Sequence, residues 1–261
     1  MKVIILCGGK GTRLKEHTES LPKPLIEIGN FPILWHIMKI YASQGFNDFV
    51  LCLGYKGELI KEYFMDARLW RRHDFSLQVQ DKGPQIQLIH PDIENWKITF
   101  VSTGEETNTG GRIKRVESLI QDDAFMVTYG DGVADIDIKK LVEFHRAHGK
   151  VGTVTAANPP SQFGLLDIQA DGRVTRFQEK PATSQWINGG FFVFQKKFFS
   201  YLGDNDILEK APLEKLASEG QLVAYKHNTF WKCMDTYKDT VTLNEIWATG
   251  KAPWKVWRNG K

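Results

Sequence analysis

The sequence is poor in cysteine and has no long apolar run. Its three cysteines, Cys7, Cys52 and Cys233, are far apart and show neither a CxxC pair nor a Cys/His spacing typical of zinc sites. They are therefore expected to be reduced thiols of the core. No stretch reaches the ~20 apolar residues that a membrane span requires, and the apolar run 3–7 is too short for a secretory signal. These absences predict a cytoplasmic protein without a membrane partner.

An excess of charge of either sign is also absent. The chain carries 34 basic and 31 acidic residues, for a net charge of +3, so its surface is mixed and lacks the basic stripe of a nucleic-acid-binding protein. The eight tryptophans have no such stripe beside them and are expected in the core or in interfaces. Nucleic acid is therefore excluded as a partner, and any anion must bind locally.

The order of apolar segments predicts the fold class. In the first half, runs of strand length at 3–7, 48–53, 97–103 and 124–130 alternate with segments of helical period, of which 33–45, 58–65, 110–121 and 136–148 are the clearest. This alternation is typical of an α/β protein with a Rossmann-like, mixed, mostly parallel sheet flanked by helices. The second half is richer in strands, at 151–157, 163–168, 173–180 and 187–194, before helices near 213–218 and 241–249.

The sequence shows no sign of a domain boundary. There is no internal repeat and no low-complexity linker, so one domain over 1–261 with a continuous sheet is expected, its two halves being approximately 1–150 and 151–261. Residues 66–95 mix charges, aromatics and prolines without a sustained period, and we expect a hairpin or a subunit contact there.

The glycine-rich segment "ILCGGKGTRL" follows the first predicted strand. It fits neither the dinucleotide fingerprint G-x-G-x-x-G, because Leu14 stands at the last position, nor the P-loop motif, because no Gly-Lys-Ser/Thr occurs in register. Glycines at the end of a strand still let backbone N–H groups approach an anion closely. Thr12 and Arg13 follow them, and Lys23 is held between two prolines in "LPKPL". A phosphate cradle is favoured over an ordinary tight turn.

The motifs "GGKGTRL", "PKPLIEIG", "TGGRIKRV", "YGDGVADIDI", "FQEKP", "INGGFFVF", "FWKCMDT" and "GKAPWK" together resemble those of the sugar-nucleotide pyrophosphorylases, and in particular their cytidylyltransferase branch. The resemblance implies a Mg²⁺-dependent reaction of CTP with α-D-glucose 1-phosphate that gives CDP-glucose and pyrophosphate. It also implies a homo-oligomer, with a hexamer as the expected state.

The resemblance implies a role for each matching residue. The expected nucleotide site comprises Gly8, Gly9, Gly11, Thr12, Arg13, Lys23 and Arg112, of which Arg13 and Lys23 act with Asp131 in catalysis. The expected acceptor site in the second half comprises Glu179, Lys180, Asn188 and Gly189. The expected metal ligands are Asp131 and Asp235, since Mg²⁺ prefers one or two carboxylates with phosphate and water oxygens.

Other interpretations remain open at several of these positions. Asp131 could simply form an Asp-Gly turn, Asp235 could be the N-cap of the next helix, and Glu179-Lys180 could be a solvated strand end. The pair His145 and His148 is interpreted as a solvated helix face, since no third metal ligand has supporting spacing.

The function also has alternatives. The acceptor could be another sugar phosphate or a non-sugar phosphate such as phosphocholine, and the chain could be a non-catalytic relative that binds nucleotide.

Overall fold

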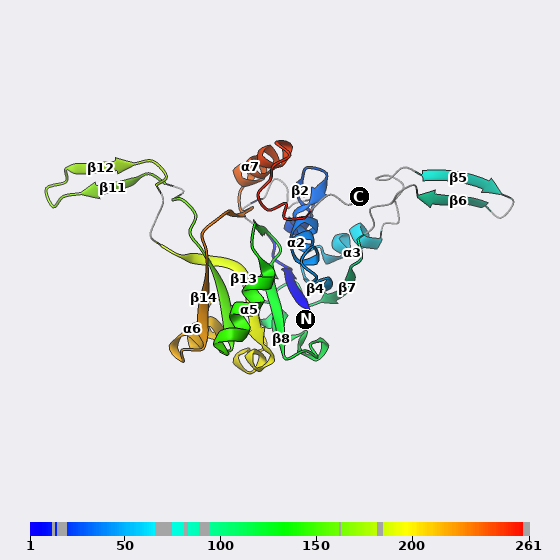
Figure 1. The fold of residues 1–261 in the computed structure, drawn as a ribbon, viewed down its shortest axis with the longest axis horizontal. Coiled ribbons are helices and arrows are strands. Elements are labelled where there is room, and N and C mark those ends of the chain that lie inside the picture. Colours follow the sequence, from blue (N-terminus) through cyan, green and yellow to red (C-terminus); the bar gives the residue numbers. More distant parts are fainter. Residues whose placement is uncertain are drawn as a thin grey trace.

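The computed structural model describes residues 1–11, 14, 20–65, 75–80, 83–88, 94–161, 163–181 and 185–257. A central sheet forms the body, and two hairpins project from opposite sides of it (Figure 1). Thr12 and Arg13 lie outside the described residues, as does part of the segment 66–95.

The central sheet is mixed and mostly parallel, as predicted. Its strand order across the described residues is β14 (Leu222–His227), β10 (Gly152–Ala157), β13 (Ile187–Gln195), β8 (Ala124–Tyr129), β1 (Val3–Cys7), β4 (Asp48–Leu53) and β7 (Lys97–Ser102). Only β13 runs antiparallel to its neighbours in this sheet, β10 and β8. The predicted continuity of the sheet across the two halves is confirmed. Strand β14, at one edge, was not predicted, because its apolar run is only four residues long, from Leu222 to Tyr225.

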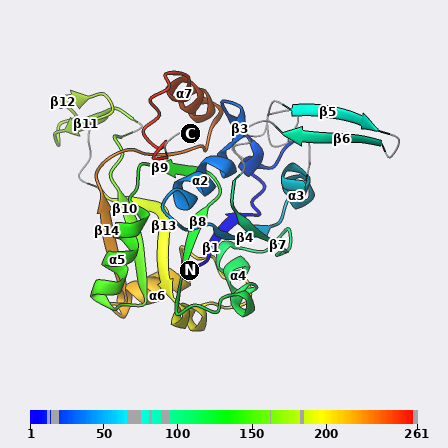
Figure 2. The ribbon, with the colours of Figure 1, turned by 45° about the vertical axis from the view of Figure 1, so that its right-hand side comes forward.

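Helices cover both faces of the sheet. One face carries α2 (Ile33–Ala42), α3 (Gly57–Met65), α5 (Ile138–His148) and α7 (Tyr237–Ala248), and the other carries α4 (Thr109–Lys114) and α6 (Ala211–Ser218), with the 3-10 helices η4 (Glu117–Leu119) and η5 (Lys196–Tyr201). Successive β1 side chains alternate between the two apolar clusters: Val3, Ile5 and Cys7 face one, and Ile4 and Leu6 face the other. Figure 2 shows the helices on either side of the strands. The sheet is therefore buried on both faces, as parallel sheets require.

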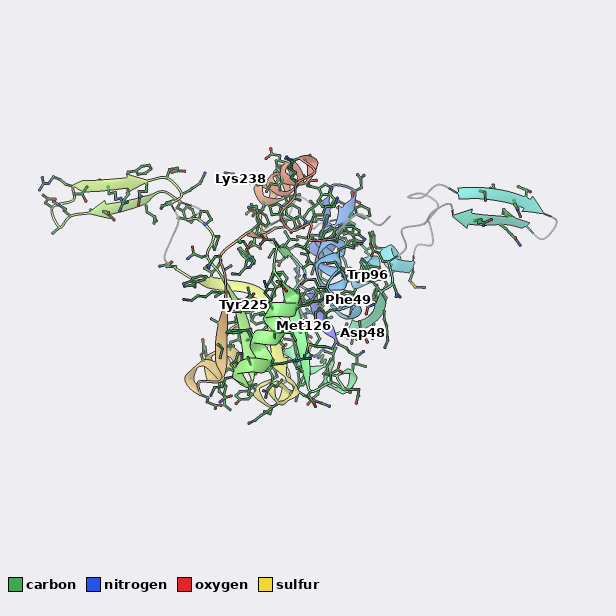
Figure 3. All side chains as sticks on the ribbon, viewed as in Figure 1. Asp48, Phe49, Trp96, Met126, Tyr225 and Lys238 are labelled. Carbon is green, nitrogen blue, oxygen red and sulfur yellow. The ribbon has the colours of Figure 1, made fainter. Side chains whose placement is uncertain are left out.

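Buried side chains from distant segments meet in the middle of the body. Phe49 on β4 and Met126 on β8 are both fully buried and lie there in Figure 3, whereas Lys238 on α7 lies at the periphery. Cys7 and Cys52 are buried free thiols, as predicted, and Cys233 is partly exposed. None of the helices in the described ranges is long and apolar enough to cross a membrane.

Two helices, α7 and α4, depart most from their predicted bounds. Helix α7 begins four residues earlier than predicted, because Thr236 caps it: its hydroxyl accepts from the Asp239 N–H while Asp239 accepts from the Thr236 N–H. Helix α4 ends at Lys114 rather than continuing to residue 121. Its two glycines weaken helical propensity, and the chain continues into η4 instead.

The two projecting hairpins are antiparallel ribbons. The first, β5 (Phe75–Gln80) with β6 (Gly83–Leu88), confirms the hairpin expected within 66–95. The second, β11 (Leu165–Ile168) with β12 (Val174–Gln178), extends from the other side of the body (Figure 1). Its side chains are largely exposed, including Ile168 and Phe177, each 63% exposed.

The histidine pair of α5 does not form a solvated face. His145 is only 2% exposed, and its Nδ1 lies 2.8 Å from the hydroxyl of Thr153. His148 reaches the same hydroxyl through Nε2 at 2.7 Å. The prediction of a solvated face was wrong, because helical periodicity does not show which side of a helix rich in polar residues packs against the sheet.

Another buried histidine lies at the centre of an aromatic cluster. His36 on α2 is fully buried, with Trp247, Trp254 and Trp257 around its ring. Its Nε2 lies 2.9 Å from the carbonyl of Ile28 and therefore donates to it. Burial lowers the pKa of His36 to about 4, so the ring is neutral in the folded protein.

We expect His36 to make the protein acid-sensitive. The unfolded chain takes up a proton on this histidine near pH 6.5, whereas the folded protein does so only near pH 4. The contribution of His36 to stability is complete above pH 6.5 and is lost as the pH falls toward 4, by about 3 kcal/mol in total. Urea unfolding at several pH values measures this loss. A His36→Gln variant should show a shallower decline over the same range, and an unchanged decline would contradict the assignment.

Candidate active site

Several chain segments end at one edge of the sheet. Strand β1 ends at Cys7 and is followed by Gly8 and Gly9, and β8 ends at Tyr129. The first residues of β13 lie at this same edge, because β13 runs antiparallel to β8. In open α/β sheets ligands bind at the carboxyl ends of the parallel strands, and this edge therefore positions the candidate site.

Lys23, Asp131 and Asp235 meet at this edge. The Nζ of Lys23 lies 2.6 Å from Oδ2 of Asp131 and 2.7 Å from Oδ1 of Asp235. All three had been singled out in the sequence, although more than 200 residues separate the first from the last. The structure thus brings the lysine and both predicted metal ligands into one cluster, which we call the Lys23 cluster.

A small ribbon explains why the two aspartates are neighbours. Strand β15 (Trp231–Cys233) pairs antiparallel with β9 (Gly132–Ala134), so that Cys233 lies opposite Gly132. The ribbon continues where the Met234 N–H donates to the carbonyl of Asp131 at 2.8 Å. Asp131 immediately precedes β9, and only Met234 separates Asp235 from the end of β15. Neither β9 nor β15 was predicted from the sequence, since both are only three residues long.

Lys23 reaches the aspartates from η2 (Lys23–Leu25), which begins immediately after Pro22. The flanking prolines restrict the backbone, and Pro24 is buried against the edge of the sheet. Burial by itself would lower the pKa of Lys23, but the attraction of Asp131 and Asp235 outweighs it and the pKa is raised. The lysine is therefore a fixed cation, and the cluster carries one net negative charge.

The alternative role of Asp235 as a helix cap does not hold. Thr236, not Asp235, caps α7. The Asp235 carboxylate instead faces Lys23 and the thiol of Cys233, 3.4 Å away. Asp131 does form a turn, but its carboxylate also points to the cluster. Their side chains are 28% and 35% exposed, so both remain accessible from the edge of the sheet.

Two cavities open beside the cluster. A cavity of about 400 Å³, the glycine-loop cavity, is lined by Gly8, Gly9, Gly11, Lys23, Arg112 and Asp131, among others. A cavity of about 270 Å³, the β13 cavity, is lined by Asp131, Asn188, Gly189, Trp231 and Asp235, among others. Tyr129 and Asp131 belong to both linings. The cluster therefore lies where a ligand in one cavity would meet a ligand in the other.

Arg112 supports the glycine loop from behind. Its guanidinium donates to the carbonyl of Gly8 at 3.0 Å and to the carbonyl of Leu53 at 3.1 Å. It also donates to the hydroxyl of Thr103 and the carbonyls of Gly104 and Glu105. A Cβ at Gly8 would lie 2.1 Å from the guanidinium carbon, so only glycine fits there. Arg112 is 4% exposed, and its predicted contact with a nucleotide stays a prediction.

The glycines beside Arg112 serve packing. A Cβ at Gly110 would lie 2.8 Å from the carbonyl of Asp206, and one at Gly111 would lie 2.6 Å from that of Asp204. The Gly111 N–H donates to the Asp206 carbonyl at 3.1 Å. This amide therefore already has a protein acceptor. The α4 glycines instead allow close contact with the loop 204–206.

Sequence reasoning missed Tyr129 and Glu209. The Tyr129 hydroxyl donates to the carboxylate of Glu209, which also accepts from Thr109 at 2.8 Å. Asn188 donates to the same hydroxyl at 3.1 Å. Burial and the Glu209 charge raise the pKa of Tyr129, so it stays protonated. Its place directly before the Gly-Asp pair was the available signal, but its apolar neighbours suggested a core residue.

Asn188 and Gly189 lie in the β13 cavity, whereas Glu179 and Lys180 do not. The latter pair follows β12 at the base of the projecting hairpin, where their side chains are 61% and 53% exposed and their charged groups lie 3.5 Å apart. Neither lines either cavity. Lys180 has a φ of 44°, in the left-handed region that favours glycine. Their predicted role in acceptor binding stays a prediction.

The described residues offer a metal two carboxylate ligands at this edge. In the described ranges no group of three or more His, Cys, Asp or Glu side chains is arranged to hold a metal ion. The Lys23 cluster contributes two carboxylates, and Mg²⁺ completes such a set with phosphate and water oxygens.

The family model for nucleotidyl transferases matches residues 2–250. With a mixed α/β sheet and an ionic cluster at its carboxyl edge, the chain belongs to the nucleotidyl transferase family, whose members are enzymes.

Three similar proteins differ in their identity to this chain and in their coverage. The glucose-1-phosphate cytidylyltransferase of Salmonella typhi is 50% identical over 98% of this chain and 100% of its own. A mannose-1-phosphate guanylyltransferase catalytic subunit beta of Xenopus tropicalis is 30% identical over 93% of this chain and 63% of its own. The crystal structure of HddC from Yersinia pseudotuberculosis superposes with a TM-score of 0.70 at 26% identity, covering 94% of this chain and 99% of that one.

We expect Arg112→Lys to destabilise the ligand-free protein by about 2–4 kcal/mol, because a lysine cannot satisfy the acceptors that the guanidinium fork reaches. Urea unfolding without nucleotide measures this change. Arg173→Lys, at an exposed residue of the β11–β12 hairpin, is the matched control and should alter stability by less than about 0.5 kcal/mol. If Arg112 served only to contact a nucleotide, the ligand-free stability of both variants would be unchanged.

Proposed function

We propose that this chain is a Mg²⁺-dependent cytidylyltransferase that converts CTP and α-D-glucose 1-phosphate to CDP-glucose and pyrophosphate. The observation that carries the proposal is the Lys23 cluster at the junction of two cavities. The 50% identity to a glucose-1-phosphate cytidylyltransferase over nearly the whole chain supports the choice of substrates, since the guanylyltransferase relative is only 30% identical. A reaction that consumes CTP fits a cytoplasmic location.

The proposed reaction is a displacement at phosphorus. A phosphate oxygen of the sugar phosphate forms a bond to the α-phosphorus of CTP, and the bond from that phosphorus to the oxygen bridging to the β-phosphate breaks. Pyrophosphate departs with the electron pair. Such transfers depend on positioning and on neutralising charge rather than on covalent catalysis.

The two cavities suit the two substrates. In the proposal the glycine-loop cavity takes the triphosphate, because the absence of Cβ atoms at Gly8 and Gly9 exposes the backbone. The guanidinium of Arg112 donates to the carbonyl of Gly8 from the protein interior, so the conformation of the loop is set before a ligand binds. The β13 cavity takes the sugar phosphate, whose hydroxyl groups would hydrogen-bond to the side-chain amide of Asn188. The predicted roles of Thr12 and Arg13 stay predictions.

Lys23 acts at the reacting phosphorus. Its ammonium lies beside both carboxylates in the ligand-free protein, and a raised pKa keeps it charged. A phosphoryl group placed between the cavities would meet this fixed cation. The charge that develops on the oxygens in the transition state is thereby stabilised by a group that needs no rearrangement of solvent.

Asp131 and Asp235 are the proposed Mg²⁺ ligands. Two part-exposed carboxylates around one ammonium leave a net negative charge, which fits a divalent cation that arrives with a nucleotide. When bound, Mg²⁺ would neutralise the triphosphate and help pyrophosphate to leave.

A pyrophosphate-release assay tests the proposal. The purified protein is incubated with CTP, UTP, dTTP or ATP against glucose 1-phosphate, mannose 1-phosphate or phosphocholine. CTP with glucose 1-phosphate should release pyrophosphate fastest, and EDTA should abolish release until Mg²⁺ is restored. Faster release with another acceptor would replace glucose 1-phosphate, and release from no pair would leave a nucleotide-binding protein without this activity.

The carboxylates are tested in the same assay. Asp131→Asn and Asp235→Asn should each lower kcat by at least about a hundredfold, because the loss of a cation ligand removes charge neutralisation of several kcal/mol. Asp135→Asn is the matched control, since Asp135 follows β9 but pairs with His227 and lines neither cavity. Normal turnover by Asp131→Asn would exclude the metal assignment.

The β11–β12 hairpin supports a homo-oligomer. It exposes Leu165, Leu166, Ile168, Val174 and Phe177. A two-stranded ribbon is marginally stable by itself, so a second copy of the chain is the proposed cover for these side chains, with a hexamer as the expected state. Light scattering should give a multimer mass for the wild type and a smaller mass for Phe177→Ser with Ile168→Ser. A monomeric wild type would contradict this.

A further inference from the structure

A third cavity, of about 660 Å³, lies at the opposite edge of the sheet and is independent of the proposed reaction. It is bounded by the start of β8, the end of α5 and the end of β13, and we call it the basal cavity. Six residues of its lining carry titratable side chains: Asp122, Asp123, His145, Arg146, Lys196 and Lys197. Strand β8 runs from this cavity to Tyr129, so the two edges are roughly 17–20 Å apart.

A chain of hydrogen bonds fixes where His145 carries its proton. The Lys150 N–H donates to Nδ1 of His148 at 2.9 Å, so the proton of that ring is on Nε2. His148 Nε2 therefore donates to the hydroxyl of Thr153 at 2.7 Å. The Thr153 hydroxyl in turn has its own proton to donate, and Nδ1 of His145 lies 2.8 Å away. His145 Nδ1 is thus the acceptor, and the proton of its ring is on Nε2.

This leaves a buried donor without an acceptor. Within the described part of the chain, Nε2 of His145 has no hydrogen-bond partner, although the residue is 98% buried. Burial, together with the nearby charges of His148 and Arg146, lowers the pKa of His145 to about 4, so the ring stays neutral. An unpaired buried N–H is costly, and an acceptor atom in the basal cavity would remove that cost.

The surroundings indicate the charge of that acceptor. Arg146, Lys196 and Lys197 bring three positive charges to the cavity. Of the two acidic residues, Asp122 already forms an ion pair: its Oδ2 lies 3.2 Å from the amino group of Met1. The basic side chains therefore outnumber the acidic ones around a neutral N–H donor. A small oxyanion meets both conditions, because it accepts hydrogen bonds and carries negative charge.

We propose that the basal cavity is a second ligand site, which binds a small oxyanion such as the phosphate group of a phosphorylated metabolite. His145 donates from Nε2 at its inner wall, and Arg146 and Lys196 neutralise the charge at its mouth. The site is remote from the Lys23 cluster, and the volume of the cavity leaves room for more than the anion itself. Asp123 is then available to accept from hydroxyl groups of a phosphorylated ligand.

Crystals soaked in arsenate locate the site directly, because arsenate is an analogue of phosphate whose arsenic can be identified by anomalous scattering. We expect an arsenic peak in the basal cavity with an oxygen within hydrogen-bonding distance of His145 Nε2. Arsenate bound beside Lys23 but absent from the basal cavity would overturn the proposal without affecting the proposed function.

Calorimetric titration with inorganic phosphate gives the energetic test. It is done in a Lys23→Met background, which removes the ammonium from the catalytic edge. Arg146→Gln with Lys196→Gln should weaken phosphate binding at least about tenfold, because the double variant removes two charge-assisted hydrogen bonds to the anion. Lys139→Gln, an exposed lysine at the other end of α5, is the control and should leave the affinity unchanged. Equal affinity in the double variant and the control would overturn the proposal. Both affected residues are exposed, so the variants should fold.

Discussion

The ion pairs between Lys23 and the two aspartates are the constraint on which the candidate site depends. A largely buried ammonium and two part-exposed carboxylates come from segments that lie far apart in the chain, and burying any one of these charges alone would cost free energy. They are tolerated because each charge has its partner. The sheet supplies the edge, the β9–β15 ribbon joins the aspartates, and prolines on either side of Lys23 limit its direction. Removing the side chain of Lys23 or of either aspartate leaves the remaining charges unbalanced. The edge of the sheet then loses the ionic cluster that distinguishes it.

A second cation, Arg112, has a different role from Lys23. Its guanidinium donates hydrogen bonds to acceptors of the protein itself, and it thereby shapes the glycine loop that Lys23 faces. Loop glycines permit that contact, since a side chain at Gly8 or Gly54 would collide with the guanidinium. The glycine-rich segment is therefore a backbone surface held in place from inside the protein. A loop that is already rigid loses less conformational entropy when a phosphate chain binds to it, so binding costs less free energy.

The same strands connect two chemically different edges. Strand β8 begins at the basal cavity and ends at Tyr129, and β13 runs the other way between Gln195 and Asn188. One edge concentrates an ionic cluster. The other holds His145, whose N–H is placed on Nε2 by a chain of hydrogen bonds and has no acceptor among the described residues. The projecting hairpins lie outside this body (Figure 1). Their exposed apolar side chains differ from those of the central strands of the body, which are buried.

The sequence by itself determined most of the strands and helices of the body, because apolar periodicity records which faces are buried: β1 and β4 were predicted to the residue. It also singled out Lys23, Asp131 and Asp235. Only the tertiary structure decided that these three meet, since the short strands β9 and β15 carry no periodic signal. It likewise decided that Arg112 binds the protein's own carbonyls and that His145 is buried. Contacts between residues a hundred positions apart depend on how elements pack, and local sequence does not encode that directly.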